Sequence, residues 1–213
     1  MDQFYRKIMC ALLAGSLAAG LLAGCGNSAG EKADTEDTAA SGENSALDKT
    51  GGDGGEITIG VTSFADTLEP TEQYFSWVVS RYGVGETLVR FDENGEIMPC
   101  LAESWEISED QLTWTFKIRE GVKFSNGDDM TPELVKASLE RTFELSDRAV
   151  SFFEPASMEV DGQNLLIKTK EPVAILPGSL ADPLFLIVDT QADTDAFAME
   201  GPICTGPYAV ESF

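Results

Sequence analysis

The chain has 213 residues, 43% of them hydrophobic, and a net charge of −23 from 37 acidic and 14 basic residues, with no histidine. Such an acidic excess disfavours nucleic acid as a partner, because binding to phosphates relies on lysine and arginine. The lack of histidine excludes a Ser-His-Asp hydrolase and a histidine-ligated metal site built from this chain alone. We therefore predict no catalytic residue, no metal site and no cofactor.

The first 24 residues have the layout of a secretion signal. Arg6 and Lys7 precede an apolar run over residues 8–24, which ends in Leu-Ala-Gly before Cys25. This is typical of a signal peptide, and a run so short and rich in glycine is a poor candidate for crossing about 30 Å of hydrocarbon. We predict cleavage after residue 24, with diacylglyceryl on the Cys25 thiol and an acyl chain such as palmitate on its new amino terminus.

Residues 25–56 have the composition of a flexible tether. They are mainly Gly, Ser, Ala, Thr, Asp and Glu, and Leu47 is the only large apolar residue among them. A segment of this kind cannot bury a core, and its expected reach is about 30 Å. The sequence therefore predicts an exported protein, held by lipid on the outer face of the cytoplasmic membrane through a disordered acidic tether.

The remaining chain begins with an expected strand and an expected helix. Residues 57–61 form a short apolar run, which predicts the first strand. A second group, spaced by three and four residues as on one face of a helix, consists of Phe75, Val78, Val79 and Tyr82. We therefore predict a helix over this stretch.

Alternation then becomes the dominant pattern. The apolar runs at 88–91 and 97–98 flank an Asp-Glu-Asn-Gly turn, which predicts a hairpin. Trp114, Phe116 and Ile118 alternate with polar residues, as in a strand with one buried face.

A helix is expected after the Asn-Gly turn at 126–127. The segment Thr131-Pro-Glu133 provides a capping hydroxyl, a proline in the first helical turn and an acidic residue near the helix start. Val135, Leu139 and Phe143 follow at a spacing of four, which gives the helix a buried stripe.

The last third of the chain predicts a second hairpin and then short pieces. Residues 158–160 and 165–167 flank an Asp-Gly turn at 161–162. Prolines at 172, 177 and 183 interrupt the next stretch, so we expect loops there and one short helix over 193–199. Together these elements indicate a mixed α/β (α+β) fold.

Three segments of the chain form an ordered set of motifs. The first is the strand Glu56-Ile-Thr-Ile-Gly-Val61 with the turn Leu68-Glu-Pro70. The second, over 101–142, contains Leu-Ala-Glu-Ser-Trp, Thr-Trp-Thr-Phe, Gly-Val-Lys-Phe-Ser-Asn-Gly and the Thr-Pro-capped helix. The third is Thr205-Gly-Pro-Tyr208. In this order they resemble the family 5 extracytoplasmic solute-binding proteins, the peptide- and nickel-type binding components of ABC importers.

The resemblance implies a fold and a division of the chain. It implies a periplasmic-binding-protein-like type II lobe with an extra α+β subdomain. Residues 57–81 would belong to the large lobe, 82–199 to the extra subdomain, and 200–213 would re-enter the large lobe. Family members continue well beyond this point to form a second lobe, so the resemblance implies that the chain is the amino-terminal part of such a protein and that the second lobe is missing.

The resemblance also implies a function and partners. A tethered protein of this family would capture a peptide or related small solute and deliver it to ABC permease subunits, working as a monomer without catalysis. The segment 73–78 departs from the nickel-type pattern, which argues against a nickel chelate. Aromatic side chains could stack on an organic solute, and the candidates are Phe64, Tyr74 and Trp77, for which core packing is the alternative.

Two other functional classes stay open at this level. A surface hydrolase could use paired carboxylates, Asp128 with Asp129 or Asp66 with Glu69, although both pairs lie beside turn signals, where acids commonly serve turns and helix dipoles. A tethered sensor or adhesion module of the same fold is the other alternative.

After loss of the signal and lipidation, two cysteines remain, Cys100 and Cys204. They could form a disulfide outside the cytoplasm or stay as buried free thiols.

Overall fold

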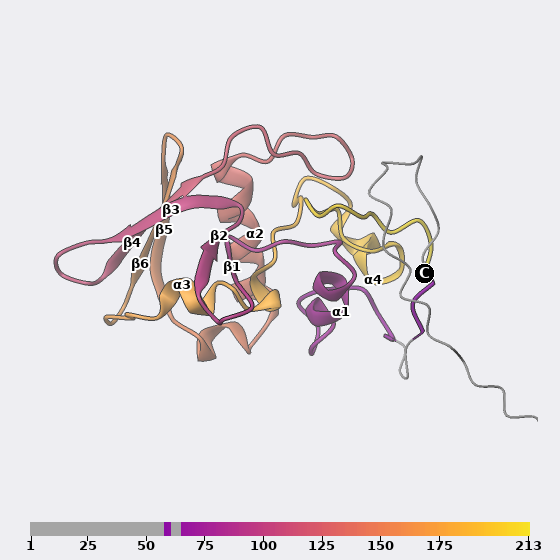
Figure 1. Cartoon of the computed structure of the whole chain (residues 1–213), viewed down its shortest axis with the longest axis horizontal. Helices are drawn as coiled ribbons and strands as arrows, with labels where there is room; N and C mark the ends of the chain where they lie inside the picture. Colours follow the sequence, from indigo (N-terminus) through magenta and orange to yellow (C-terminus); the bar gives the residue numbers. More distant parts are fainter. Residues whose placement is uncertain (1–57, 61–64) are drawn as a thin grey trace, which may run out of the picture. The chain divides into compact units, whose positions relative to one another are not determined.

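The computed structural model describes residues 58–60 and 65–213 (Figure 1). The predicted signal peptide, Cys25, the tether and Phe64 lie outside the described residues. Residues 58–60 have no regular secondary structure, so the strand predicted over 57–61 is wrong for its described part. The division into lobes and an extra subdomain stays a prediction.

A four-stranded antiparallel sheet is built from two hairpins. Its strands are β3 (Ala102–Ile107), β4 (Thr113–Ile118), β5 (Pro155–Asp161) and β6 (Asn164–Thr169), in the order β3-β4-β6-β5. The predicted strand around Trp114 and the predicted Asp-Gly hairpin are both confirmed. Gly162 turns the second hairpin with φ +56, a backbone region that favours glycine.

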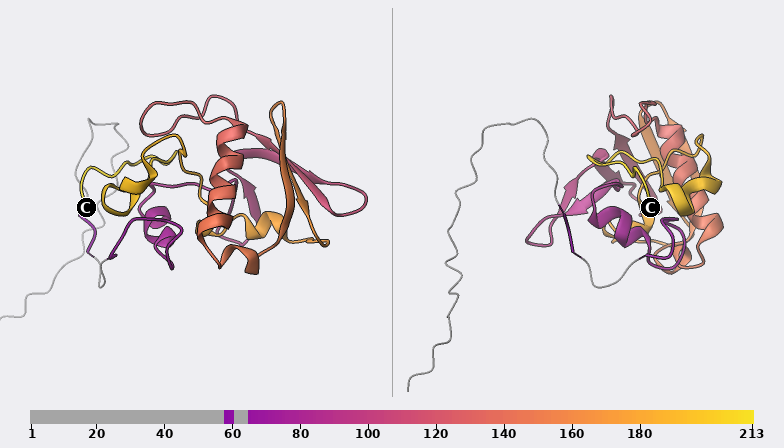
Figure 2. Two further views of the ribbon diagram at one scale, coloured as in Figure 1. Left: turned by 180° about the vertical axis from the view of Figure 1, so that it is seen from behind. Right: turned by 90° about the vertical axis from the view of Figure 1, so that its right-hand side faces the viewer.

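Helix α2 (Pro132–Leu145) lies across one face of this sheet (Figures 1 and 2). Its predicted start is confirmed, since Oγ1 of Thr131 accepts a hydrogen bond from the Leu134 amide at 3.3 Å. Val135 and Leu139 are fully buried. The helix and the apolar face of the sheet therefore form the larger core cluster.

The hairpin of β1 (Val89–Phe91) and β2 (Ile97–Pro99) is confirmed as well. It packs near α3 (Leu176–Ser179), a short helix in a stretch expected to be loop. Pro177 does not prevent this helix, because it lies in the first turn of α3. Backbone N–H groups in the first turn have no partner within the helix, so the N–H that proline lacks is not needed there.

A second, smaller core cluster lies around α1 (Ser76–Arg81) and α4 (Phe197–Glu200). Three short 3-10 helices complete the described elements: Ala149–Ser151, Pro183–Phe185 and Thr194–Ala196. The helix predicted over 193–199 is thus confirmed as a 3-10 turn followed by α4. The smaller cluster contains Val79, Val84, Leu186, Val188, Phe197 and Cys204.

Candidate functional site

An open hollow of about 840 Å³ lies beside α1, within the usual size range of small-molecule sites. Its described lining is mainly apolar, with one basic residue, Arg81, and no acidic residue. The lining includes both the start of α1 and residues close to position 213, which lie on the same side of the described unit in Figure 1. The residues from the stretch around α1 are Gln73, Tyr74, Phe75, Val78, Val79, Arg81 and Tyr82.

Tyr74 is held at the rim of this hollow by an arginine from another element. The guanidinium carbon of Arg148 lies 4.0 Å from the centre of the Tyr74 ring, which is cation–π geometry. Arg148 also donates a hydrogen bond from Nη1 to the carbonyl oxygen of Gln73. Gln73 itself has φ +44, a conformation uncommon for a residue other than glycine. The Tyr74 ring remains 65% exposed, so it is placed at the surface rather than in the core.

The structure does not place the other two aromatic candidates, Trp77 and Phe64, in the described lining of the hollow. Trp77 lies on α1 and is 45% exposed, but it is not among the residues that line the hollow. Phe64 lies outside the described residues. The structure therefore brings Tyr74 to the hollow, and the ligand-binding role of all three stays a prediction.

Sequence reasoning did not identify Arg81 or Arg148 as candidate site residues. Arg148 contacts a residue 75 positions earlier in the chain, and no spacing or local pattern could connect the two. The sequence did offer a local signal that could have drawn attention to Arg81. This residue lies in the last turn of α1, where a basic side chain interacts favourably with the helix dipole.

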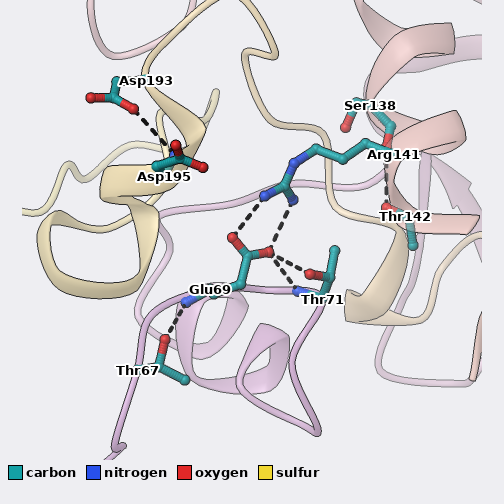
Figure 3. A network of polar contacts seen from close by, with 8 residues as sticks. All are labelled: Thr67, Glu69, Thr71, Ser138, Arg141, Thr142, Asp193 and Asp195. Carbon is teal, nitrogen blue, oxygen red and sulfur yellow. Dashed lines mark hydrogen bonds and ion pairs between the residues drawn. The ribbon is translucent and has the colours of Figure 1, made fainter. Parts of the chain in front are cut away.

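A buried ion pair fixes the segment that leads to the hollow (Figure 3). The Glu69 carboxylate accepts two hydrogen bonds from the Arg141 guanidinium, at 2.9 and 2.8 Å, and one from Oγ1 of Thr71 at 2.6 Å. Burial alone would raise the pKa of Glu69, but the hydrogen bonds from Arg141 and Thr71 and the charge of Arg141 hold it below the ordinary value. Since Arg141 belongs to α2, the pair ties the Leu68-Glu-Pro70 turn to the main helix.

Three of the four carboxylates considered for catalysis have structural partners. The Asp128 carboxylate accepts a hydrogen bond from Nδ2 of Asn126 at 2.9 Å, and Asp129 forms an ion pair with Lys123 at 2.6 Å. Glu69 is occupied by Arg141, as above. Within residues 58–60 and 65–213, no group of three or more Asp, Glu, Cys or His residues could hold a metal ion. No helix in this part of the chain is long and apolar enough to cross a membrane.

Both remaining cysteines are free thiols in the structure. Cys100 is half-buried, with its sulfur 3.8 Å from Oε1 of Glu86, whereas Cys204 is 1% exposed. Burial, and then the negative charge of Glu86, raise the pKa of Cys100 to about 11. Burial raises the pKa of Cys204 further above its ordinary value.

We expect both thiols to be almost unreactive in the folded protein at pH 8, because the thiolate is the reactive form. A protein made of residues 26–213 contains only these two cysteines. Titration with 5,5′-dithiobis(2-nitrobenzoate) should show slow reaction at Cys100, protection of Cys204, and two rapidly reacting thiols after denaturation without reductant. Finding no thiol in the denatured, unreduced protein would instead establish the disulfide.

Comparisons with known proteins agree with the fold. A nickel ABC transporter structure from Bacillus halodurans is 42% identical, with a TM-score of 0.64, over 70% of this chain and 30% of that one. NikA from Staphylococcus aureus, solved in complex with Ni(L-His)2, is 30% identical with a TM-score of 0.64, over 70% of this chain and 31% of its own. The mixed α/β fold is therefore that of a type II periplasmic binding protein, matched over part of the chain.

Curated sequences and a family model give the same result. The nickel-binding protein NikA of Staphylococcus aureus is 30% identical over 160 residues, 75% of this chain and 31% of its own. The glutathione-binding protein GsiB of Escherichia coli is 29% identical over 167 residues, 74% of this chain and 32% of its own. The model "Bacterial extracellular solute-binding proteins, family 5 Middle" matches residues 96–213. The chain belongs to this family and spans about a third of the length of these curated relatives.

Proposed function

We propose that this chain is the solute-binding component of an ABC importer that takes a peptide or a related small organic solute. The observation that carries the proposal is the hollow of about 840 Å³ beside α1, which has the size and apolar lining of a ligand site. Membership of the family supports it. On this proposal the protein captures and releases its solute without making or breaking a bond.

An organic solute is favoured over nickel because the segment 73–78 departs from the nickel-type pattern. The relatives are named for nickel and for glutathione, so kinship alone does not select one solute. Tyr74, with its exposed ring at the rim, is the aromatic contact that we propose first, followed by Trp77 and Phe64.

Capture would follow the lobe-closure mechanism of binding proteins, in which the bound solute stabilises the closed form. The described unit would supply one wall of the cleft. Lipid on Cys25 and the acidic segment 25–56 would keep the monomeric protein on the outer face of the membrane, within reach of its permease. The amino-terminal sequence supports this part of the proposal.

We expect the full-length gene product, produced without its first 25 residues and purified gently, to carry an organic solute that mass spectrometry can identify. Returning that solute at about a hundred times its Kd to stripped protein should add about 2.7 kcal/mol of stability, measured as a rise in Tm. Metal analysis of the same sample should show no stoichiometric nickel. The absence of any bound solute, together with no thermal shift in a broad screen, would refute the proposal.

A further inference from the structure

The corner formed by residues 124–129 carries one amide side chain that links distant parts of the chain. Nδ2 of Asn126 donates to Oδ2 of Asp128 and to Oδ2 of Asp189, both at 2.9 Å. Oδ1 of the same amide accepts a hydrogen bond from the Asp128 backbone amide at 3.0 Å. Both ends of the Asn126 amide are therefore in use, and the contact with Asp189 spans 63 positions of the sequence.

Asp189 depends on this amide because it is a buried carboxylate, only 1% exposed. Its oxygens accept hydrogen bonds from the Gln191 backbone amide and from Nδ2 of Asn126, each at 2.9 Å. In the part of the chain that the structure describes, no lysine or arginine forms an ion pair with it. A carboxylate in place of the Asn126 amide would remove one of these hydrogen bonds and add repulsion between like charges.

The sequence at this corner is chemically labile. Asn-Gly pairs occur at 94–95 and at 126–127. In such a pair the glycine backbone nitrogen can attack Cγ of the asparagine, because glycine has no Cβ to hinder the approach. The new C–N bond closes a succinimide ring, and the side-chain nitrogen leaves as ammonia. Water then opens the ring at either carbonyl, which gives aspartate or isoaspartate and so puts a carboxylate where the amide was.

The fold holds Asn126 more firmly than Asn94. In both pairs the glycine amide donates to a backbone carbonyl oxygen, at 2.9 Å after Asn126 and at 3.1 Å after Asn94. The Asn94 side chain contacts only its own exposed turn, through Nδ2 to Oδ2 of Asp92 at 3.3 Å. Such a turn opens locally at little cost, whereas freeing Asn126 also breaks the hydrogen bond to the buried Asp189.

We propose that Asn126 is a deamidation site whose conversion loosens the 124–129 corner permanently. While the corner is closed, its hydrogen bonds protect the amide. Once the amide is lost during a transient opening, a carboxylate at this position faces the two carboxylates to which the amide donated, and the corner no longer closes as before. The Ser125 amide still donates to the Cys204 carbonyl oxygen at 2.8 Å, so the corner is loosened rather than detached.

The first test follows both Asn-Gly pairs by peptide mapping with mass spectrometry. The full-length gene product, produced without its first 25 residues, is incubated at mildly alkaline pH with and without urea. We expect Asn126 to deamidate at least roughly tenfold more slowly than Asn94 in the folded protein, and at a similar rate in urea. Equal rates at the two sites in the folded protein would overturn the inference.

The second test uses Asn126→Asp, which reproduces the aspartate product, in urea unfolding near pH 7. We expect the ratio of folded to unfolded protein to fall roughly ten- to a hundredfold, whereas the matched control Asn94→Asp should change it less than about threefold. Adding Asp189→Asn to Asn126→Asp exchanges the amide and the carboxylate, and this double variant should recover part of the loss.

Each outcome of the second test decides the inference. An Asn126→Asp midpoint equal to that of the wild type, or a double variant no more stable than Asn126→Asp, would refute it. If Asn126→Asp gives no soluble protein, a soluble double variant supports the inference and an insoluble one refutes it. None of these results bears on solute binding, so the proposed function is tested separately.

Discussion

Replacing Gly206 with alanine is expected to destabilise the protein by about 3 kcal/mol or more, because the new methyl group would overlap backbone atoms. A Cβ at this position would lie 2.2 Å from the Gly83 carbonyl oxygen and 2.5 Å from that of Val84. The same two segments of the chain are joined by hydrogen bonds, from the Gly206 amide to the Val84 carbonyl oxygen at 3.0 Å and from the Tyr208 amide to the Gly83 carbonyl oxygen at 3.2 Å. Backbone so held cannot move aside without losing those bonds.

Urea unfolding of the full-length gene product measures this effect, with Gly178→Ala as the control. A Cβ at Gly178 would meet Ile97 and Phe91 at 3.6 and 3.7 Å, which is ordinary contact, so that change should stay within about 0.5 kcal/mol. If Gly206→Ala gives no soluble protein while Gly178→Ala is obtained in normal yield, this also supports the prediction, because it indicates an even larger destabilisation. A midpoint for Gly206→Ala equal to that of the wild type would contradict the prediction.

Local patterns in the sequence were sufficient for most of the sheet and for α2. The alternation around Trp114 and the cap at Thr131 depend on neighbours a few residues away, and the structure confirms both. Helix α3 was not predicted, because a proline such as Pro177 usually interrupts a helix. Only the structure shows that Pro177 lies in the first turn, where proline is tolerated. The Thr205-Gly-Pro-Tyr208 segment contributed to the family resemblance. The physical need for glycine at position 206, which is its close approach to Gly83 and Val84, depends on chain packing.

The candidate site was less accessible to sequence reasoning, because its geometry joins distant parts of the chain. Tyr74 was identified as an aromatic candidate, with core packing as the alternative. Its partner Arg148 follows α2 in the chain, 75 positions away from the Gln73 carbonyl that it contacts. Glu69 was considered only as half of a carboxylate pair with Asp66. Its partner in the structure is Arg141, and the choice between catalytic acid and ion-pair partner depends on a contact across 72 positions.

The Glu69–Arg141 pair should be the second large contributor to stability. Both side chains are mostly buried, 10% and 15% exposed, and the pair is bidentate at 2.8–2.9 Å. Removing one member of a buried pair leaves the other charge without compensation, which typically costs about 3–5 kcal/mol. We expect Glu69→Gln to lie near the lower end of that range, because the amide can still accept one hydrogen bond from Arg141.

The pH dependence separates this ion pair from a simple packing defect. The pKa of folded Glu69 is lowered from the ordinary value of 4.5, so the pair stabilises the protein fully above that value and loses its contribution as the pH falls through the folded pKa. The gap between wild type and Glu69→Gln, measured by urea unfolding, should therefore be widest near pH 7 and shrink on acidification below 4.5. Glu154→Gln, which breaks the exposed pair with Lys170, should change stability by no more than about 1 kcal/mol. A gap for Glu69→Gln that stayed constant down to pH 3 would mean that shape rather than charge holds the Leu68-Glu-Pro70 turn against α2.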